Sequence, residues 1–342
     1  RIAAEAEVDD PVGLSGSGLV AFGAFTFAAE SDRPSVLIVP RVIVGCRDGV
    51  AWVTRVDDAD DPVAPSPPGA EYRIPLHPGA LDPARYRTIV AEAVARIEAG
   101  ELQKVVLARD LTGHLPAGSD QRRVLGDLAL GYPDTWTFAV DGLIGSSPET
   151  LVRVNHGVVT ARVLAGSAAR GIDAPSDQAA SLGLATSTKD LDEHRFAVQS
   201  VLAALAGHTQ GVAASEVPYA LKLPNLWHLA TDVEGVLADG STVLDLAAVL
   251  HPTAAVAGSP TDAALATIAE LEGIDRRRYG GPVGWVDRNG DGKWAVALRC
   301  AEVADDGTIT AYAGAGIVAG SDPERELTET RLKFRPIVEV FG

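Results

Sequence analysis

The sequence has no methionine, only two cysteines and few aromatic residues, and each shortage limits what the chain can be. Cys46 and Cys300 lie far apart in the sequence. They match neither a disulfide framework nor a zinc spacing, so we expect two small buried residues in a protein of the reducing cytoplasm. Because not even an initiator methionine is present, we expect the numbering to begin inside the natural chain.

Basic residues and long apolar runs are also scarce. The 29 lysines and arginines are outnumbered by 46 aspartates and glutamates, which gives a formal net charge of −17. Such a chain has no basic stripe to neutralise phosphates, so we exclude a nucleic-acid partner, and an anionic small molecule would need a locally positive pocket. No apolar run reaches membrane-spanning length and no signal-peptide pattern opens the chain, so we expect no membrane partner.

The pattern that is present is typical of a globular α+β protein. Hydrophobic residues make up 46% of the chain, and short strand-like runs alternate with amphipathic stretches. Helices are predicted from Asp82 to Gly100 and over residues 189–206, and hairpin-length connections favour a mainly antiparallel sheet. We interpret residues 1–342 as one domain, in which a strand-rich, variable part (1–80) and a Pro-rich linker candidate (61–78) precede a motif-bearing part (81–342).

Strand predictions follow from runs of β-branched residues and from period-2 alternation. The first sixty residues contain two such runs, and a hairpin is expected around residues 151–163. Near the C-terminus we expect a meander of strands over 283–287, 294–303 and 308–313. The segments predicted as strands are 37–39, 42–44, 104–109, 136–140, 151–154, 158–163, 283–287, 294–303 and 308–313.

The last forty residues combine a glycine-rich turn with the start of a helix. Residues 312–322 predict a strand and turn, and a helix follows over 323–333, with Ser321 as N-cap and Glu324 completing a capping box. Glu326 and Glu329 then share one face with Lys333. Oxygen ligands for a hard cation thus lie beside glycines whose N–H groups can bind an anion, which indicates an acidic substrate held through Mg²⁺.

The start of the helix at 189–206 repeats this arrangement. Asp190 and Glu193 have the same i, i+3 spacing as Glu326 and Glu329, so two such faces that meet could hold one Mg²⁺. The alternative is that each pair of carboxylates only complements the positive end of its helix, which is worth about 0.3–1 kcal/mol.

Two further charged residues stand in apolar or turn surroundings. Lys104 begins the run Lys-Val-Val-Leu-Ala-Arg109. If its side chain is buried, loss of solvation favours the neutral amine that a general base needs; otherwise it is an edge lysine that extends to solvent. Glu149, in Gly145-Ser-Ser-Pro-Glu-Thr150, could be the complementary proton donor, or an ordinary turn carboxylate.

An arginine and a glycine-rich segment complete the candidates. Arg299 lies within the apolar stretch predicted as one strand, and a buried guanidinium requires a carboxylate partner from the protein or from a substrate. Tyr279 precedes Gly280-Gly-Pro-Val-Gly-Trp285, where bare glycines allow a ligand to approach the backbone.

Taken in order, these motifs resemble those of the chorismate-utilising enzymes of menaquinone, siderophore and tryptophan biosynthesis, over roughly residues 80–342. That resemblance implies the family's α+β fold, two antiparallel β-sheets packed face to face with helices on the outside. The segments that carry it are 102–109, 145–150, 164–167, 187–194, 226–229, 251–253, 279–285, 298–300 and the glycine-rich stretch with the helix after it, 314–333.

The resemblance also implies a role for each candidate residue. Glu193 and Glu329 would hold Mg²⁺, supported by Asp190 and Glu326, and the metal would bind the ring carboxylate of chorismate. Lys104 would deprotonate the water that attacks C2, while Glu149 protonates the C4 hydroxyl as it leaves. Around the substrate, the resemblance assigns His228 to the neighbourhood of the reacting oxygen and anion binding to Gly166, Ser167, Tyr279, Arg299, Gly314, Gly316 and Lys333.

Within that family, lysine at position 104 indicates hydration of chorismate to isochorismate, because members that aminate chorismate carry a glutamine-like residue there. The resemblance therefore predicts a Mg²⁺-dependent isochorismate synthase that needs no glutamine amidotransferase subunit. A salicylate synthase, which goes on to eliminate pyruvate, is the first alternative, although the apolar segment 254–258 resembles isochorismate synthases. An anthranilate synthase-like component and a non-catalytic binding module are the others.

Overall fold

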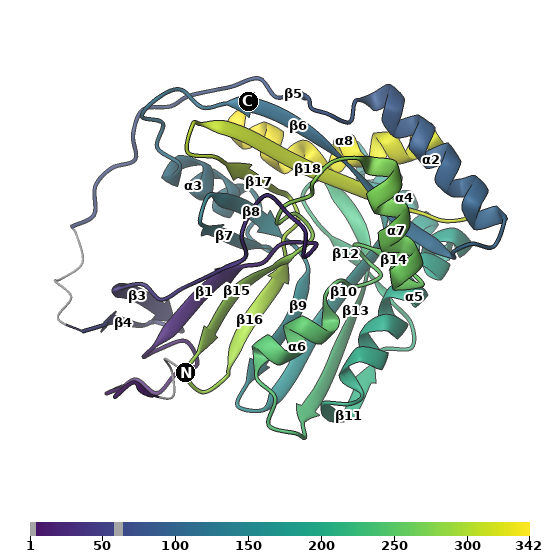
Figure 1. Ribbon diagram of the computed structural model, residues 1–342. Helices are drawn as coiled ribbons and strands as arrows, with labels where there is room; N and C mark the ends of the chain where they lie inside the picture. The colour runs from purple at the N-terminus through teal and green to yellow at the C-terminus, as the bar shows by residue number, and fades with distance from the viewer. Residues whose placement is uncertain (1–4, 58–63) are drawn as a thin grey trace.

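The computed structural model describes residues 5–57 and 64–342 and consists of β-sheets with helices on their outer sides (Figure 1). Every strand pairing among these residues is antiparallel. None of the helices in this part of the chain has the length and hydropathy needed to cross a membrane.

The larger sheet has nine strands and combines the first strand of the chain with strands from its middle and its C-terminal third. Strand β1 (Val20–Ala24) is an inner strand of this sheet, where Val20 pairs with Asp287. In spatial order the strands are β11 (Thr209–Ala214), β13 (Leu226–Leu237), β10 (Val158–Ala169), β9 (Thr150–Asn155), β16 (Gly292–Val296), β15 (Pro282–Asp287), β1 (Val20–Ala24) and β2 (Val36–Ile38), with β12 (Tyr219–Lys222) also paired to β13.

The second sheet has seven strands, and a separate two-stranded hairpin lies beside the larger sheet (Figure 1). The seven strands are β14 (Gly258–Ser259), β6 (Lys104–His114), β18 (Thr308–Ile317), β17 (Cys300–Val303), β8 (Leu143–Ser147) and β7 (Trp136–Val140), with β5 (His77–Pro78) paired to β6. The hairpin consists of β3 (Val42–Arg47) and β4 (Val50–Arg55). Because the ends of a strand are defined only to within a residue or two, these strands agree with most of the segments predicted from the alternating pattern.

Small and medium side chains from both large sheets meet in one buried cluster. Ala24, Val283 and Ala295 come from the nine-stranded sheet, while Ala108 and Leu143 come from the seven-stranded one. Close packing of these faces excludes water and holds the sheets at a fixed separation. The predicted fold class, α+β with antiparallel sheets packed face to face and helices outside, is therefore confirmed.

The helices cover the outer faces of the two sheets. Helices α2, α7 and α8 pack on the seven-stranded sheet, with α3 near β7 and β8, while α4, α5 and α6 pack on the nine-stranded sheet (Figure 1). Within the described residues the helices are α2 (Pro83–Glu98), α3 (Arg122–Gly131), α4 (Ala174–Thr186), α5 (Thr188–Leu205), α6 (Val243–Leu250), α7 (Thr261–Glu272) and α8 (Pro323–Phe341).

Helix α2 begins at the predicted N-cap, whereas the N-cap of helix α8 lies one residue after the predicted one. Asp82 caps α2 as predicted, because its carboxylate accepts hydrogen bonds from Ala84 N and Arg85 N. The prediction of Ser321 as N-cap of α8 is wrong: Asp322 is the cap, and its carboxylate accepts from Arg325 N at 2.9 Å. The Ser321 hydroxyl instead accepts from Val318 N in the preceding turn. Both residues can cap a helix, so the local sequence does not separate them.

The single strand predicted over residues 294–303 is two strands. Strand β16 belongs to the nine-stranded sheet and β17 to the seven-stranded sheet, and the chain crosses between them at Arg299, whose φ is +50°. A similar crossover carries Glu149 between β8 and β9. The crossovers are hydrogen-bonded to each other, from Val296 N to Glu149 O and from Ser146 N to Arg299 O. An unbroken apolar run gave no sign of this break.

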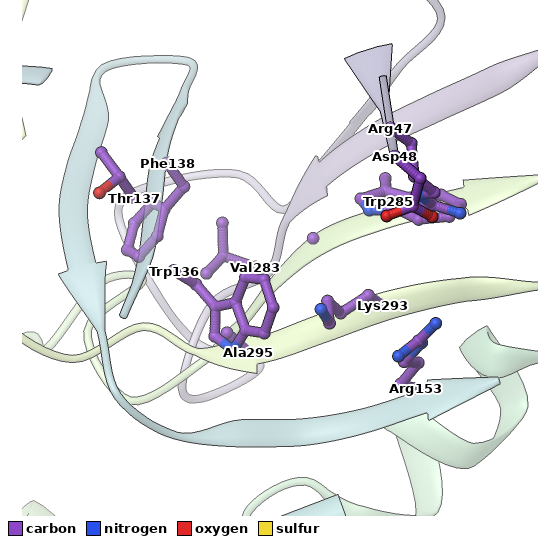
Figure 2. A pocket seen from close by; sticks show the side chains of 11 residues that line it. Arg47, Asp48, Trp136, Thr137, Phe138, Arg153, Val283, Trp285, Lys293 and Ala295 are labelled. Carbon is purple, nitrogen blue, oxygen red and sulfur yellow. The ribbon is translucent and has the colours of Figure 1, made fainter. Parts of the chain in front are cut away.

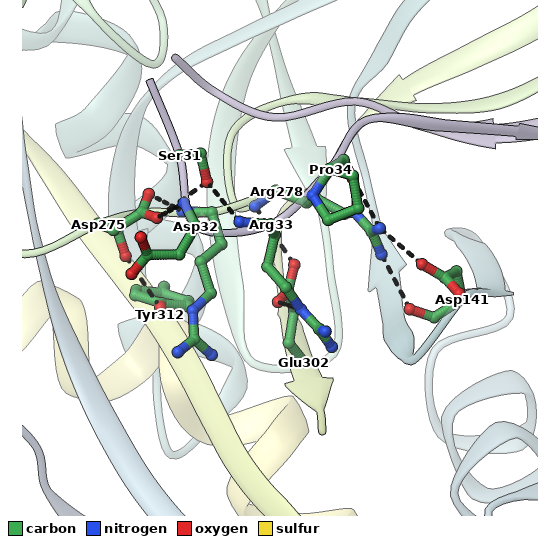
Figure 3. Close-up of polar contacts among 10 residues, drawn as sticks. Ser31, Asp32, Arg33, Pro34, Asp141, Asp275, Arg278, Glu302 and Tyr312 are labelled. Atoms are coloured by element: carbon green, nitrogen blue, oxygen red, sulfur yellow. Dashed lines mark hydrogen bonds and ion pairs between the residues drawn. The ribbon is translucent and has the colours of Figure 1, made fainter. Parts of the chain in front are cut away.

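The N-terminal segment is attached to the rest of the chain through charged side chains (Figure 3). The fully buried guanidinium of Arg278 donates to Pro34 O at 2.7 Å and to the main-chain oxygen of Asp141 at 2.8 Å, and Arg33 pairs with Glu302. These bonds join the segment after β1 to the seven-stranded sheet and to the loop before β15. The division into a variable part (1–80) and a motif-bearing part (81–342) stays a prediction.

Two smaller predictions about the N-terminal part have mixed outcomes. Cys300 is buried, but Cys46 is exposed on β3, so the expectation of two buried cysteines is wrong for Cys46. Cys46 belongs to the two-stranded β3–β4 hairpin, in which Val44, Val50 and Val53 are exposed as well, so part of this hairpin faces solvent. Residues 61–63 of the proposed linker lie outside the described residues, and residues 64–76 form no helix or strand.

Candidate active site

One cavity between the two large sheets collects most of the predicted site residues. Elements far apart in the sequence contribute to it: the crossovers after β8 and before β17, the strands β10, β13 and β18, and the helices α5 and α8. Its lining residues are Val106, Pro148, Glu149, Leu164, Ala165, Gly166, Ser167, Glu193, His228, Ala255, Val256, Tyr279, Leu298, Arg299, Gly314, Gly316 and Lys333.

The four predicted residues outside that list lie next to it. Lys104 contacts Glu193 from the start of β6. Asp190, Glu326 and Glu329 line the adjoining opening, which shares Ser167 with the cavity. The structure therefore brings all fourteen predicted site residues into one region, although the role of each stays a prediction.

Lys104 is completely buried, so the interpretation as an edge lysine that reaches solvent is wrong. Its Nζ lies 3.2 Å from Oε1 of Glu193, and among the described residues no acceptor has hydrogen-bond geometry to it. Because an ammonium group inside a protein is costly unless its hydrogens are bonded, this amine is held by a single ion pair and retains free bonding capacity beside the cavity.

Glu149 occupies the crossover between the two sheets, where its side chain is buried and lines the cavity. Burial raises the pKa of Glu149 to about 8, against the opposing effect of Lys104, Arg299 and Lys333. At neutral pH the carboxyl therefore holds a proton, which is the state that a general acid requires.

Arg299 presents a guanidinium to the same cavity without a carboxylate of its own. Among residues 5–57 and 64–342 no acidic side chain lies within ion-pair distance of it, and its Nη2 donates to Nε2 of His228 at 2.9 Å. Removal of a guanidinium from water without an anionic partner is unfavourable, so this group is suited to bind the carboxylate of a ligand.

His228 is held as a neutral imidazole of one tautomer. Because Arg299 donates to Nε2, the ring proton is on Nδ1, which faces Gly166 O at 3.2 Å and the Ser167 hydroxyl at 2.9 Å. Burial and the charges of Arg299 and Lys333 hold the pKa of His228 well below its usual range. Gly166 has φ of +80° at a register shift between β10 and β13, and this irregularity places its carbonyl at the imidazole.

Strand β18 supplies backbone groups to the cavity, and helix α8 supplies the cation Lys333. Gly314 has no side chain, and a Cβ there would lie 3.2 Å from the hydroxyl of Tyr279 and 2.8 Å from Leu107 O. Burial raises the pKa of Tyr279 to about 12, so its hydroxyl remains a donor. Lys333 Nζ donates to Gly314 O at 3.0 Å and pairs with Glu329 at 2.6 Å.

Carboxylates from the starts of α5 and α8 line one opening. Lys189 of α5 pairs with Glu326 of α8 at 2.6 Å, which joins the two helix starts. Burial and the neighbouring charge of Glu329 raise the pKa of Glu326, and burial with the charges of Glu193 and Glu329 raises the pKa of Asp190. The charge of Glu329 on α8 therefore acts on Asp190 of α5 across the opening.

The donor set fits a hard divalent cation by its chemistry. All four candidate ligands are carboxylates, and a cation among them would relieve the mutual repulsion that raises the pKa of Asp190 and Glu326. In the described part of the chain, however, no group of three or more His, Cys, Asp or Glu side chains has the spacing of a metal site. Glu193, Glu326 and Glu329 are each paired with a lysine instead.

The surroundings of Gly316 show how closely Glu193 and Lys104 are packed against β18. A Cβ at this position would collide with the carboxylate of Glu193 and lie 3.2 Å from Cε of Lys104. Both side chains are buried and cannot withdraw freely, so we expect Gly316→Ala to lower the catalytic activity at least tenfold. The measurement is steady-state kinetics. Gly126→Ala is the control, because no atom lies within 4 Å of a Cβ there, and it should keep full activity. Full activity in Gly316→Ala would contradict this packing argument.

Some residues of this region were not among those predicted from the sequence. Lys189 lies within segment 187–194 and pairs with Glu326, a contact between distant helices that the sequence does not reveal. Ala255 and Val256 form a wall of the cavity, in agreement with the apolar segment singled out at 254–258. Glu272 and Arg276 were not considered; both are buried behind that wall. Their i, i+4 spacing was the available signal.

A second concavity lies where β7 meets β15 and β16 of the nine-stranded sheet (Figure 2). Arg47, Arg153 and Lys293 line it with Trp136, and Lys293 lies over the Trp136 ring at 3.0 Å. Burial, together with the charges of Arg153 and Arg47, lowers the pKa of Lys293 to about 7. The acidic residue that lines this concavity, Asp48, is exposed to solvent and offers no buried acid beside the amine, so the cavity between the sheets is the candidate active site.

Comparison with known proteins finds relatives over most of the chain. The chain is 41% identical over 273 residues to the isochorismate synthase DhbC of Bacillus subtilis, a match that covers 76% of this chain and 68% of that protein. It is 37% identical to the putative isochorismate synthase MenF of Mycobacterium tuberculosis, over 96% of this chain and 88% of that one. A crystal structure of a putative 2,3-dihydroxybenzoate-specific isochorismate synthase, DhbC from Bacillus anthracis, superimposes with a TM-score of 0.80 at 34% identity, over 95% of this chain and 84% of the other.

A buried lysine lies beside this cavity, and a buried carboxyl and a guanidinium line it; groups of these kinds are what acid–base catalysis uses. The family is shown directly by sequence, because the family model described as chorismate binding enzyme matches residues 59–342. The chain belongs to the chorismate binding enzymes.

Proposed function

We propose that this protein is an isochorismate synthase, which converts chorismate reversibly to isochorismate with Mg²⁺. The observation that carries the proposal is the pair of buried groups Lys104 and Glu149 at one cavity, an amine and a carboxyl whose pKa of about 8 keeps it protonated. Addition of water with loss of a hydroxyl requires one base and one acid. The proteins to which the chain is 37–41% identical carry the name isochorismate synthase, which supports the same reaction.

Substrate binding would use the polar and cationic groups that line the cavity. In this proposal Arg299 and Tyr279 bind the enolpyruvyl carboxylate together with the backbone at Gly314 and Gly316, because the guanidinium lacks an acidic neighbour. Gly166, Ser167 and Lys333 complete the anion-binding shell, and the neutral His228 lies near the departing or incoming oxygen.

Two residues of this chain then transfer protons to and from the substrate and water, one as base and one as acid. From its neutral form, the amine of Lys104 removes a proton from the water as the water oxygen forms a bond to C2, and the double bonds shift as the bond from C4 to its hydroxyl breaks. Glu149 gives its proton to that hydroxyl, which leaves as water. One water enters and one leaves, so the reaction is an isomerisation, and in the reverse direction the two residues exchange the roles of acid and base.

For the metal, we propose that Glu193 and Glu329 hold Mg²⁺, with Asp190 and Glu326 in support. When bound, the ion would neutralise the ring carboxylate of chorismate and fix its position. Residues of α5 and α8 would then bind the same ion, and Lys189 would remain as a counter-charge for Glu326.

Removal of the metal is the direct test of this part. Excess EDTA should abolish turnover of chorismate, and Mg²⁺ should restore it. In calorimetry Glu329→Gln should weaken Mg²⁺ binding at least tenfold, because one carboxylate of the donor set is lost. Glu324→Gln is the matched control on the same helix, since Glu324 pairs with Arg87 at the surface. Unchanged turnover in EDTA would remove Mg²⁺ from the proposal.

The reaction itself is tested by incubating the protein with chorismate and Mg²⁺ and separating the products. Isochorismate without pyruvate is the expected result, and its amount should level off at an equilibrium mixture with chorismate. Salicylate with an equal amount of pyruvate would make the protein a salicylate synthase instead. Anthranilate with ammonium would indicate an anthranilate synthase-like component, and unchanged chorismate would favour a binding module. Activity of the isolated chain would agree with the prediction that no glutamine amidotransferase subunit is needed.

A further inference from the structure

Behind the apolar wall of the active site lies a buried ion pair whose two residues are not among those that line the cavity. Glu272 ends α7 and Arg276 follows four residues later, and the two residues are 1% and 3% exposed. Arg276 Nε donates to Oε2 of Glu272 at 2.9 Å, and a second bond joins its Nη2 to Oε1. A buried ion pair is weak evidence for added stability, because loss of solvation offsets the attraction, so its other contacts are informative.

Each partner also binds the backbone of strand β6. Oε1 of Glu272 accepts from Ala108 N at 2.7 Å, and Nη2 of Arg276 donates to Val106 O at 2.6 Å. On this edge of β6 the short strand β14 pairs only with Lys104 and Val105, and Val106 N donates to Ala257 O. Beyond that point the carboxylate acts as acceptor and the guanidinium as donor, in place of the backbone groups of a partner strand.

The same guanidinium holds the wall of the cavity. Nη1 of Arg276 donates to Val256 O at 2.9 Å, and Val256 lines the cavity together with Ala255. The ion pair thus connects two parts of the active site that are far apart in the chain. One is the strand that carries Lys104, and the other is the wall against which a ligand ring would lie.

Side-chain alternation along β6 relates Lys104 to the residues whose backbone the ion pair binds. Lys104, Val106 and Ala108 alternate with residues of the opposite face, so their side chains leave β6 on the same side. Val106, whose carbonyl is bound by Arg276, lines the cavity directly. A shift of β6 along its edge would move Lys104 relative to the Ala255–Val256 wall, and displacement of a reacting group by about 1 Å can cost on the order of 100-fold in rate.

We propose that Glu272 and Arg276 are positioning residues, which fix the strand of Lys104 against the Ala255–Val256 wall and so set the distance between base and substrate. The proposal rests on the proposed function, since it assigns the pair to the hydration step. It concerns geometry in the bound complex and therefore predicts an effect on turnover that is larger than the effect on substrate binding.

The test is steady-state kinetics of Arg276→Lys. This variant keeps a positive charge beside Glu272 but cannot reach Val106 O, Val256 O and the carboxylate at once. We expect kcat to fall 10- to 100-fold, while KM for chorismate changes less than threefold and the protein stays folded at the assay temperature by circular dichroism. Glu270→Gln is the matched control: Glu270 is on the same helix, pairs with Arg96 at the surface, and its loss should leave kcat unchanged.

A second variant covers the case in which Arg276→Lys does not fold. Glu272→Gln keeps an amide oxygen for Ala108 N and removes the charge, and we expect the same decrease of kcat at a KM within threefold of the wild type. A variant that is folded, has a lowered melting temperature and keeps the wild-type kcat would overturn the proposal, because the pair would then be only structural. Failure of the proposed function is a different result: the wild-type protein itself would form no isochorismate.

Discussion

Replacement of Lys104 by glutamine should abolish the hydration of chorismate while the protein still binds it. The amide has no basic nitrogen, so the attacking water loses its proton acceptor, and general base catalysis of this kind contributes roughly 10²- to 10⁴-fold. Lys104 is completely buried at the edge of the cavity and lies 3.2 Å from Glu193. The measurement combines product formation with calorimetric binding of chorismate in the presence of Mg²⁺.

Lys104→Arg separates the role of a base from that of a counter-ion. Arginine keeps a positive charge next to Glu193 but cannot give up its proton in a protein, so this variant should be as inactive as Lys104→Gln. An active arginine variant would show that the charge alone matters and that another group takes the proton. Lys222→Gln, on the exposed side of β12, serves as a control for the loss of a lysine and should retain wild-type activity.

Glu149→Gln should eliminate turnover and at the same time make the protein more stable at alkaline pH. Burial raises the pKa of Glu149 to about 8, whereas the unfolded chain titrates near 4.5. Between these values the folded state keeps a proton that the unfolded state releases, so the stability of the wild type falls as pH rises from about 4.5 to 8. The loss over this interval is on the order of 3–5 kcal/mol, and a glutamine cannot contribute to it.

Two measurements check this prediction. The free energy of unfolding of wild type and Glu149→Gln is measured in urea at pH 5 and at pH 8. Relative to the wild type, the variant should be more stable at pH 8 than at pH 5. In the wild type, the rate of isochorismate formation should fall as pH rises through about 8, because the general acid loses its proton. A pH-independent difference in stability would mean that the carboxyl titrates normally.

The elements were largely predictable from the sequence for physical reasons, and the candidate site residues predicted with them lie in one region of the fold. Helical periodicity and turn residues are local, so α2, α5 and most strands were expected close to their observed limits. The spacing of Asp190 with Glu193 and of Glu326 with Glu329 indicated two matching faces, and Lys189 now joins them through Glu326.

The parts that could not be predicted depend on long-range geometry. The run through Arg299 is apolar on both sides, and nothing local distinguishes one long strand from two strands in different sheets. The N-cap of α8 is Asp322 and not the predicted Ser321. The two adjacent residues are equally able to cap a helix, so the sequence does not decide between them. The pairing of Glu272 and Arg276 with β6 is a contact between distant segments, and only the fold makes it visible.

The position of β1 within the nine-stranded sheet has a consequence for the order in which the chain can assemble. Val20 pairs with Asp287, and β2 pairs with the opposite edge of β1. During synthesis the ribosome therefore releases β1 long before β15 exists, and the two edges of β1 cannot both be satisfied until the C-terminal third has emerged. Contacts of such long range slow folding and leave a strand edge open to wrong partners, so we expect late completion of the sheet and a dependence on chaperones.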